Sequence, residues 1–152
     1  MTQIAFILLC HKDPEGVIAQ TLRDVAALDP GRIACFSYAH IPWVKPQMRL
    51  IDGAALPSAA GKAALYLQIA EGLRAMGYRA IGMDHFAKPD DAMAGCFDGG
   101  TLRRNFQGYS TAPNDWLIGL GASAISQTPE GIAQNAPPLG QYRAAIEAGR
   151  LA

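Results

Sequence analysis

Polar and aromatic side chains gather at two places where an apolar run of the sequence ends. Tyr38-Ala39-His40-Ile41-Pro42-Trp43 follows one such run, and Met83-Asp84-His85-Phe86 follows another. Parallel α/β folds place their sites at the carboxyl ends of strands, so each cluster is a candidate edge of a site. The alternative for His40, and for the Asp84–His85 pair, is a structural role in which neighbouring groups satisfy the imidazole ring.

A third segment mixes cations, an amide and aromatic rings, and it reads Arg103-Arg104-Asn105-Phe106-Gln107-Gly108-Tyr109. Guanidinium groups donate paired hydrogen bonds to anions, and they also stack on aromatic rings. The segment is therefore suited to an anionic or planar ligand. A surface hairpin with packed aromatic side chains is the alternative. The sequence contains no recognisable nucleophile–base pair, phosphate-binding loop or metal-ligand cluster.

The cysteines and histidines are too widely spaced to indicate a metal site. Cys10, Cys35 and Cys96 include no C-x-x-C pair, and the three histidines form no H-x-x-x-H pattern. A zinc or iron–sulfur site made by this chain alone is unsupported. We expect buried free thiols, as in a reducing compartment.

The composition excludes several classes of protein. The 152 residues include 13 basic and 13 acidic ones, and 50% are hydrophobic, so disorder and a phosphate-binding nucleic-acid module are not expected. The most apolar stretch, residues 4–10, is much shorter than the roughly 20 residues of a membrane span. No basic flank precedes it, as a signal peptide would require, so we expect a soluble cytoplasmic protein.

The first half of the chain alternates between predicted strands and helices. Residues 4–9 and 33–38 are apolar runs typical of buried strands, and they flank a helix that begins at Asp13-Pro14 and ends at Asp29-Pro30-Gly31. This β-α-β order with short links predicts parallel strands. After an irregular segment with three prolines, residues 41–57, we expect a helix over residues 59–76 and a strand over residues 79–84.

The second half of the chain has a weaker pattern. Asp90-Asp91 can begin a short helix, residues 101–111 are a strand or hairpin arm, and residues 141–147 are a final helix. Residues 117–126 are apolar with regularly placed glycines, so the backbone there can approach a ligand or another element closely.

Three strings of residues, in this order and spacing, resemble one known family. They are Tyr38-Ala39-His40-Ile41-Pro42-Trp43, then Ile81-Gly82-Met83-Asp84-His85-Phe86-Ala87-Lys88-Pro89-Asp90-Asp91, then Asn105-Phe106-Gln107-Gly108-Tyr109-Ser110-Thr111 followed by Leu117-Ile118-Gly119-Leu120-Gly121-Ala122-Ser123-Ala124-Ile125. The resemblance is to the oxygen-independent coproporphyrinogen III oxidases, the radical S-adenosylmethionine family of heme synthesis called HemN. It covers nearly the whole chain but only a middle-to-late part of a family member.

The resemblance implies an α/β fold, a fragment of a radical-S-adenosylmethionine partial (β/α) barrel with parallel strands and helices. A hairpin or irregular region and a short C-terminal helix would follow. Residues 17–152 would form the barrel segment and the beginning of the C-terminal region. Residues 1–16 would be an atypical strand–turn start.

The resemblance also implies an activity, the oxidative decarboxylation of coproporphyrinogen III to protoporphyrinogen IX in heme and porphyrin biosynthesis. Family members use S-adenosylmethionine and a [4Fe–4S] cluster that a C-x-x-x-C-x-x-C motif binds. Four positions carry over as cofactor-binding residues. Ala39 matches a position beside the first S-adenosylmethionine, and Phe106, Gln107 and Ile125 match positions beside the second.

The cluster motif itself is absent, because the three cysteines lack its spacing. No catalytic residue and no metal ligand carries over, so the chain alone is expected to be an inactive, truncated relative. The alternative is a non-enzymatic remnant that binds a nucleoside-like ligand or a partner, and a third possibility is a product that folds poorly. Only 17% of the residues are charged, which predicts exposed apolar surface and self-association.

Overall fold

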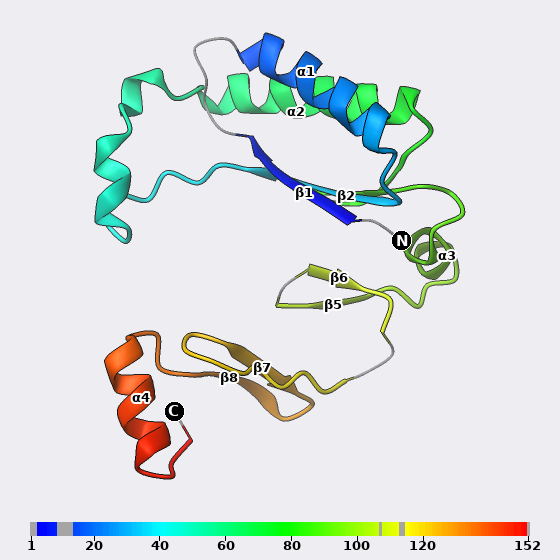
Figure 1. Cartoon of the computed structure of the whole chain (residues 1–152). Coiled ribbons are helices and arrows are strands. Elements are labelled where there is room, and N and C mark those ends of the chain that lie inside the picture. The colour runs from blue at the N-terminus through cyan, green and yellow to red at the C-terminus, as the bar shows by residue number, and fades with distance from the viewer. Residues whose placement is uncertain (1–2, 9–13, 107, 113–114, 152) are drawn as a thin grey trace. The chain divides into compact units, whose positions relative to one another are not determined.

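The computed structural model describes residues 3–8, 14–106, 108–112 and 115–151. The chain divides into two compact units, Met1–Asp98 (unit 1) and Gly99–Ala152 (unit 2), and each is described by itself. Figure 1 labels the elements of both units. The boundary expected between residues 1–16 and residues 17–152 stays a prediction.

Unit 1 is built on a four-stranded sheet with the order β1-β2-β4-β3. Its strands are β1 Gln3–Leu8, β2 Arg32–Ser37, β3 Arg79–Gly82 and β4 His85–Ala87. β1 pairs with β2 in parallel over all six residues, which confirms the direction that the β-α-β pattern predicts. β4 is antiparallel to both β2 and β3, so β3 runs in the same direction as β2.

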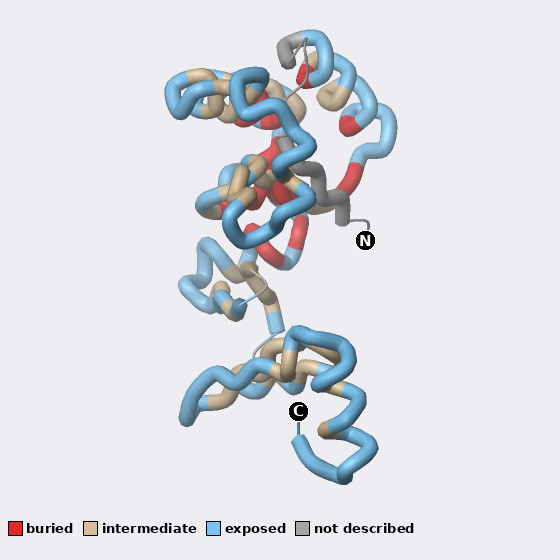
Figure 2. The backbone as a smooth tube through the Cα atoms, turned by 90° about the vertical axis from the view of Figure 1, so that its left-hand side faces the viewer, coloured by how far each residue is buried: buried red, intermediate tan, exposed pale blue. Residues whose placement is uncertain are grey.

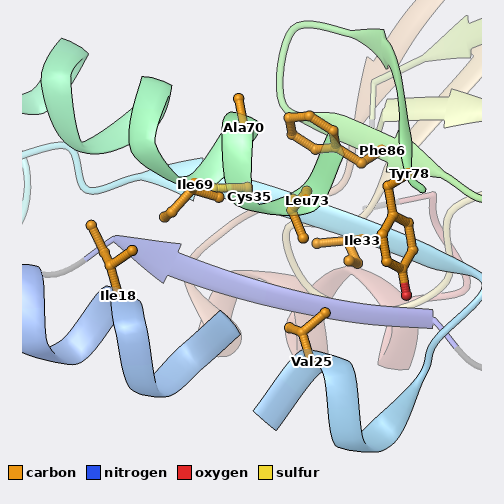
Figure 3. Packing of buried hydrophobic residues seen from close by; sticks show 9 residues of the cluster. All are labelled: Ile18, Val25, Ile33, Cys35, Ile69, Ala70, Leu73, Tyr78 and Phe86. Carbon is orange, nitrogen blue, oxygen red and sulfur yellow. The ribbon is translucent and has the colours of Figure 1, made fainter. Parts of the chain in front are cut away.

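Two helices cover one face of this sheet and enclose the core with it. They are α1 Pro14–Leu28 and α2 Ala59–Ala75, which lie side by side (Figure 1). Figure 3 shows the cluster between them, in which Ile33 and Cys35 of β2 meet side chains from both helices. Burying each large apolar side chain contributes roughly 1.5–3 kcal/mol, so this cluster is the main source of stability in unit 1. Its members are Ile18, Val25, Ile33, Cys35, Ile69, Ala70, Leu73, Tyr78 and Phe86.

The local chemistry of the helix ends follows the sequence. Ser58 begins α2 by accepting a hydrogen bond from the backbone N–H of Gly61 at 3.1 Å. Pro14 stands at the first position of α1, where its missing N–H costs nothing. The third helix, α3 Ala92–Asp98, begins after Asp91, whose carboxylate accepts from the backbone N–H of Met93 at 2.7 Å.

The expected strand over residues 79–84 is two strands in the structure. β3 ends at Gly82, and the pairing of Gly82 with His85 leaves Met83 and Asp84 as a two-residue hairpin loop. Met83 has φ +46°, the left-handed region that such loops require. The Met83-Asp84 pair lacks the Asn-Gly or Asp-Gly signature of this turn. The strand predicted from the apolar pattern therefore continued past Gly82, where β3 ends.

The segment between β2 and α2 contains neither α-helix nor strand, as its prolines predict. It holds two short 3-10 turns, η1 Pro46–Leu50 and η2 Gly53–Ala55. None of residues 41–57 is buried. This segment is therefore a connection on the surface of unit 1.

Unit 2 consists of two antiparallel hairpins and a helix. The hairpins are β5 Arg103–Asn105 with β6 Gly108–Ser110, and β7 Ile125–Thr128 with β8 Gly131–Gln134, and the helix is α4 Leu139–Glu147. Among the residues of unit 2 that the structure describes, none is buried, whereas unit 1 has a continuous buried core (Figure 2).

The fold is thus a mixed α/β arrangement with small antiparallel sheets. The α/β class and the hairpin with a short final helix agree with the expectation, and a barrel is not confirmed. No helix within the described ranges is long and apolar enough to cross a membrane.

Candidate functional site

The four expected cofactor-binding residues fall in different parts of the structure. Ala39 is exposed and lies just beyond the carboxyl end of β2 in unit 1. Phe106 and Ile125 belong to unit 2, at the loop of the first hairpin and at the start of β7. Gln107 lies outside the described residues.

Hydrogen bonds involve both neighbours of Ala39, the Tyr38 backbone and the His40 side chain. The ammonium group of Lys62, from α2, donates to the Tyr38 carbonyl oxygen at 3.1 Å. The Tyr38 hydroxyl and the His40 Nδ1 lie 3.2 Å apart, and a Cβ on Gly53 would lie 4.0 Å from the other ring nitrogen of His40. His40 is therefore held between β2's end and η2. Ala39 itself offers only a methyl group and its main chain to a ligand.

Asp84 and His85 support the hairpin between β3 and β4. The Asp84 Oδ1 lies 2.7 Å from the His85 Nδ1, and the His85 residue is only 8% exposed. The Asp84 carbonyl also accepts a hydrogen bond from the backbone N–H of Cys35 at 2.7 Å. These contacts favour the structural role that was the alternative to a candidate edge of a site.

Cys35 is unsuited to bind a metal in this structure. Burial raises the pKa of its thiol to about 12, and the negative charge of Asp84 adds to the effect. A metal ligand must be the thiolate, which this site disfavours. Across the described ranges, no three His, Cys, Asp or Glu side chains gather in a way that could hold a metal ion. The residues that the structure describes do not fit a [4Fe–4S] cluster.

Phe106 presents an apolar ring to solvent. Asn105 pairs with Gly108, so Phe106 lies directly after the last paired residue of β5, and the Phe106 residue is 63% exposed. Arg104 and Tyr109 stand opposite each other in the same hairpin, with the guanidinium carbon 5.5 Å from the ring centroid. The hairpin expected in this region is confirmed, and Phe106 is not one of its packed aromatics.

Ile125 is half-buried and lies against the glycine-rich segment that precedes β7. A Cβ on Gly119 would lie 2.6 Å from the Ile125 carbonyl oxygen, so only glycine fits there without a shift of the backbone. The Asn135 amide also ties this segment, donating to the Gly121 carbonyl at 2.9 Å. The small residues of this segment therefore permit close approach to another element of the chain.

A cavity of about 480 Å³ opens between the two hairpins of unit 2. Arg103 lines it and donates from Nη1 to the Asp115 carboxylate at 2.8 Å. The mix of cations and an amide in residues 103–109 indicated an anionic ligand. The sequence did not indicate Asp115 or the opposite wall of the cavity, which residues 127–129 form. Their distance along the chain hid them, since only the folded hairpins bring these residues together. The lining residues are Arg103, Arg104, Asn105, Ser110, Ala112, Asp115, Trp116, Leu117, Gln127, Thr128 and Pro129.

Comparison with known proteins finds close relatives among the curated sequences. The chain is 45% identical over 143 residues to the oxygen-independent coproporphyrinogen III oxidase of Paracoccus denitrificans (strain Pd 1222), which covers 94% of this chain and 32% of that relative. It is 46% identical over 135 residues to the enzyme of the same name from Thermostichus vulcanus, covering 89% of this chain and 40% of that relative. The chain therefore spans roughly a third of the length of these relatives.

A solved structure agrees with these alignments. It is described as coproporphyrinogen III oxidase (HemN) from Escherichia coli, a radical SAM enzyme. It matches with a TM-score of 0.89 and 42% identity, over 99% of this chain and 35% of that one. No protein-family model matches the chain.

Proposed function

We propose that this chain, a homologue of one segment of the oxygen-independent coproporphyrinogen III oxidases, takes part in the oxidative decarboxylation of coproporphyrinogen III to protoporphyrinogen IX. The observation that carries the proposal is the fold match at a TM-score of 0.89 together with 42% identity over almost the whole chain. Porphyrinogen is then the substrate, and the pathway is heme biosynthesis.

The topology of unit 1 supports its assignment to a partial (β/α) barrel. β1, β2 and β3 run in one direction, and α1 and α2 connect them in the β-α-β order. In this proposal β4 is a short antiparallel addition between β2 and β3. Residues 17–152 then hold the barrel segment and the beginning of the region that follows it, and residues 1–16 form its atypical start.

We place S-adenosylmethionine as the cofactor, with Ala39 as a binding residue of a first molecule and Phe106, Gln107 and Ile125 as binding residues of a second. When bound, it supplies the means of removing hydrogen from the propionate side chains of the substrate. Phe106 offers an exposed apolar ring to a sulfonium or a flat base, and Ile125 an aliphatic side chain. Ala39 contributes through its main chain, which the Lys62 contact to Tyr38 holds in place.

The second candidate function is a non-enzymatic module that binds a nucleoside-like ligand. The exposure of the Phe106 ring favours it, and the raised pKa of the Cys35 thiol disfavours that cysteine as a ligand of a cluster. Both candidate functions require the binding of S-adenosylmethionine or a similar nucleoside, but only the first includes a chemical reaction.

Calorimetry with S-adenosylmethionine tests the binding that both candidates require. We expect the 152-residue chain to bind and Phe106→Ser to weaken binding by about tenfold, because stacking on an aromatic ring contributes on the order of 1–3 kcal/mol. Phe97→Ser is the matched control, since Phe97 is a 45% exposed phenylalanine on α3 outside the proposed site. Equal affinities for both variants would contradict the site.

Reconstitution with iron and sulfide separates the enzyme from the binding module. We expect no cluster absorbance and no cleavage of S-adenosylmethionine by this chain alone. A stable four-iron cluster with cofactor cleavage would overturn the expectation of inactivity. A chain that binds without cleaving, but restores cleavage when mixed with a cluster-bearing segment of a relative, supports the enzymatic proposal over the binding module.

A further inference from the structure

We propose that the cavity between the hairpins of unit 2 is a carboxylate-binding site, and that Asp115 holds the position of the ligand's carboxylate while no ligand is bound. This inference rests on the proposed function for the identity of the ligand. In that function, the carboxylate is a propionate arm of the porphyrinogen.

The cation of the site already binds a carboxylate. Arg103 donates from Nη1 to the Asp115 Oδ1 at 2.8 Å, a normal length for a charge-assisted hydrogen bond. Both side chains are more than half exposed, at 57% and 58%. An exposed pair of this kind adds little stability, so an incoming carboxylate can replace Asp115 on Arg103 at small cost.

A second arginine, Arg104, also lines the cavity. Arg104 follows Arg103 on β5, and its guanidinium carbon lies 5.5 Å from the ring centroid of Tyr109, the residue opposite it on β6. This stacking limits the rotamers of a long side chain and so lowers the entropy lost on binding. The charged residues that line the cavity are these two arginines and Asp115. The lining therefore has a net positive charge, which becomes stronger when Asp115 moves away.

The rest of the cavity suits the remainder of a flat organic acid. Its volume of about 480 Å³ is typical of pockets for small molecules, which range over roughly 300–1,000 Å³. Trp116 and Leu117 line it with apolar surface, and Trp116 is 59% exposed and so available to a ring. Gln127 and Thr128 bring polar groups from β7 to the opposite wall. The ligand class is thus a carboxylate carried on a flat or apolar framework.

Fluorescence of Trp116 measures occupancy of the cavity. Trp43→Phe removes the other tryptophan, which lies in unit 1 outside the cavity. All tryptophan fluorescence of this variant therefore comes from Trp116. The probes are coproporphyrin III, which has free carboxylates, and its tetramethyl ester, which has the same ring without them. We expect the acid to quench Trp116 and the ester to bind at least about tenfold more weakly, because each lost charge-assisted hydrogen bond costs about that factor.

The variants separate the roles of the three charges. Arg103→Gln and Arg104→Gln should each weaken binding of the acid by about tenfold. Asp115→Asn should tighten it about threefold, because it removes the competitor for Arg103 and keeps the size of the side chain. Arg143→Gln, on the exposed surface of α4, is the matched control and should change nothing. A gain in affinity on Asp115→Asn cannot arise from a damaged fold.

Three outcomes overturn the inference: the ester binds as well as the acid, the Asp115→Asn variant loses affinity, or inorganic phosphate displaces the acid at equal concentration. The third outcome would make the cavity a general anion site. Failure here remains distinct from failure of the proposed function. A chain that binds S-adenosylmethionine through Phe106 but ignores coproporphyrin III contradicts only the carboxylate site.

Discussion

At the scale of single residues, burial decides the chemistry of Cys35. The residue is 2% exposed within the core of unit 1, and the pKa of its thiol is raised to about 12 from an ordinary 9.0 by burial and by the charge of Asp84. The thiol therefore stays protonated near neutral pH and behaves as a small apolar side chain. The sequence predicted a buried free thiol at this position, and the structure confirms it for Cys35.

Alkaline pH should destabilise the native chain through this thiol. Between pH 9 and pH 12 the unfolded state releases the Cys35 proton while the native state keeps it, so the free energy of unfolding falls as pH rises, by about 1.4 kcal/mol per pH unit. Urea unfolding of the wild type and of Cys35→Ala at several pH values measures the difference. Tyr66 and Tyr78 also have raised pKa values; Tyr78 contributes equally to both proteins, whereas part of the Tyr66 shift comes from Cys35 and is lost with it in the variant. Parallel curves would contradict this prediction.

Residue types indicated part of the proposed ligand-binding region but not its full geometry. The run of cations, amide and aromatics around Arg103 was recognisable because these types are rarely placed together without a ligand or a hairpin to explain them. Asp115 and Gln127 could not be found in this way, since only the folding of two hairpins brings them to Arg103. For Gly119, the sequence predicted a close approach of the backbone to another group. It did not predict that this group would be the backbone of Ile125.

At the scale of elements, periodicity predicted the long helices well and the short strands less well. The helix expected over residues 59–76 is α2 Ala59–Ala75, because seventeen residues repeat their apolar positions several times. β8, with four exposed residues, has no such repetition. The Thr128-Pro129-Glu130-Gly131 turn before it did carry a signal, since proline second and glycine fourth are typical of a β-turn.

The buried face of α2 should account for most of its contribution to stability. Leu73 is fully buried in the core, whereas Leu67 on the same helix is 56% exposed. Leu73→Ala should lower the free energy of unfolding by about 2–5 kcal/mol, because it removes apolar contacts and leaves a cavity. Leu67→Ala should change it by less than about 0.5 kcal/mol. Chemical denaturation measures both, and similar losses in the two variants would show that α2 does not pack as described.

At the scale of the whole molecule, apolar side chains are distributed unevenly. Unit 2 has no buried residue in its described part, yet it exposes large apolar side chains. The low charged fraction of 17% becomes intelligible in this light, because surface that would ordinarily be polar is apolar here. The side chains of unit 2 that are more than half exposed include Phe106, Trp116, Ile118, Leu120 and Ile132.

We expect the isolated chain to bind a hydrophobic dye and to associate with itself as its concentration rises. Dye fluorescence and sedimentation velocity measure the two effects. The pair Ile118→Ser and Leu120→Ser should reduce both, since these residues are 64% and 89% exposed in unit 2. Leu28→Ser with Leu67→Ser, on exposed helix positions of unit 1, is the control pair. A monomer that does not respond to the dye would contradict the prediction.

The surface connection over residues 41–57 has one further consequence. The strands before it, β1 and β2, and the strands after it, β4 and β3, belong to one sheet because β4 pairs with β2, and α1 and α2 share one core across the same division. A protease that cut this connection would leave both peptides bound to each other through the sheet and the core. We therefore expect two separately expressed halves of unit 1, divided within this connection, to reassemble when they are mixed.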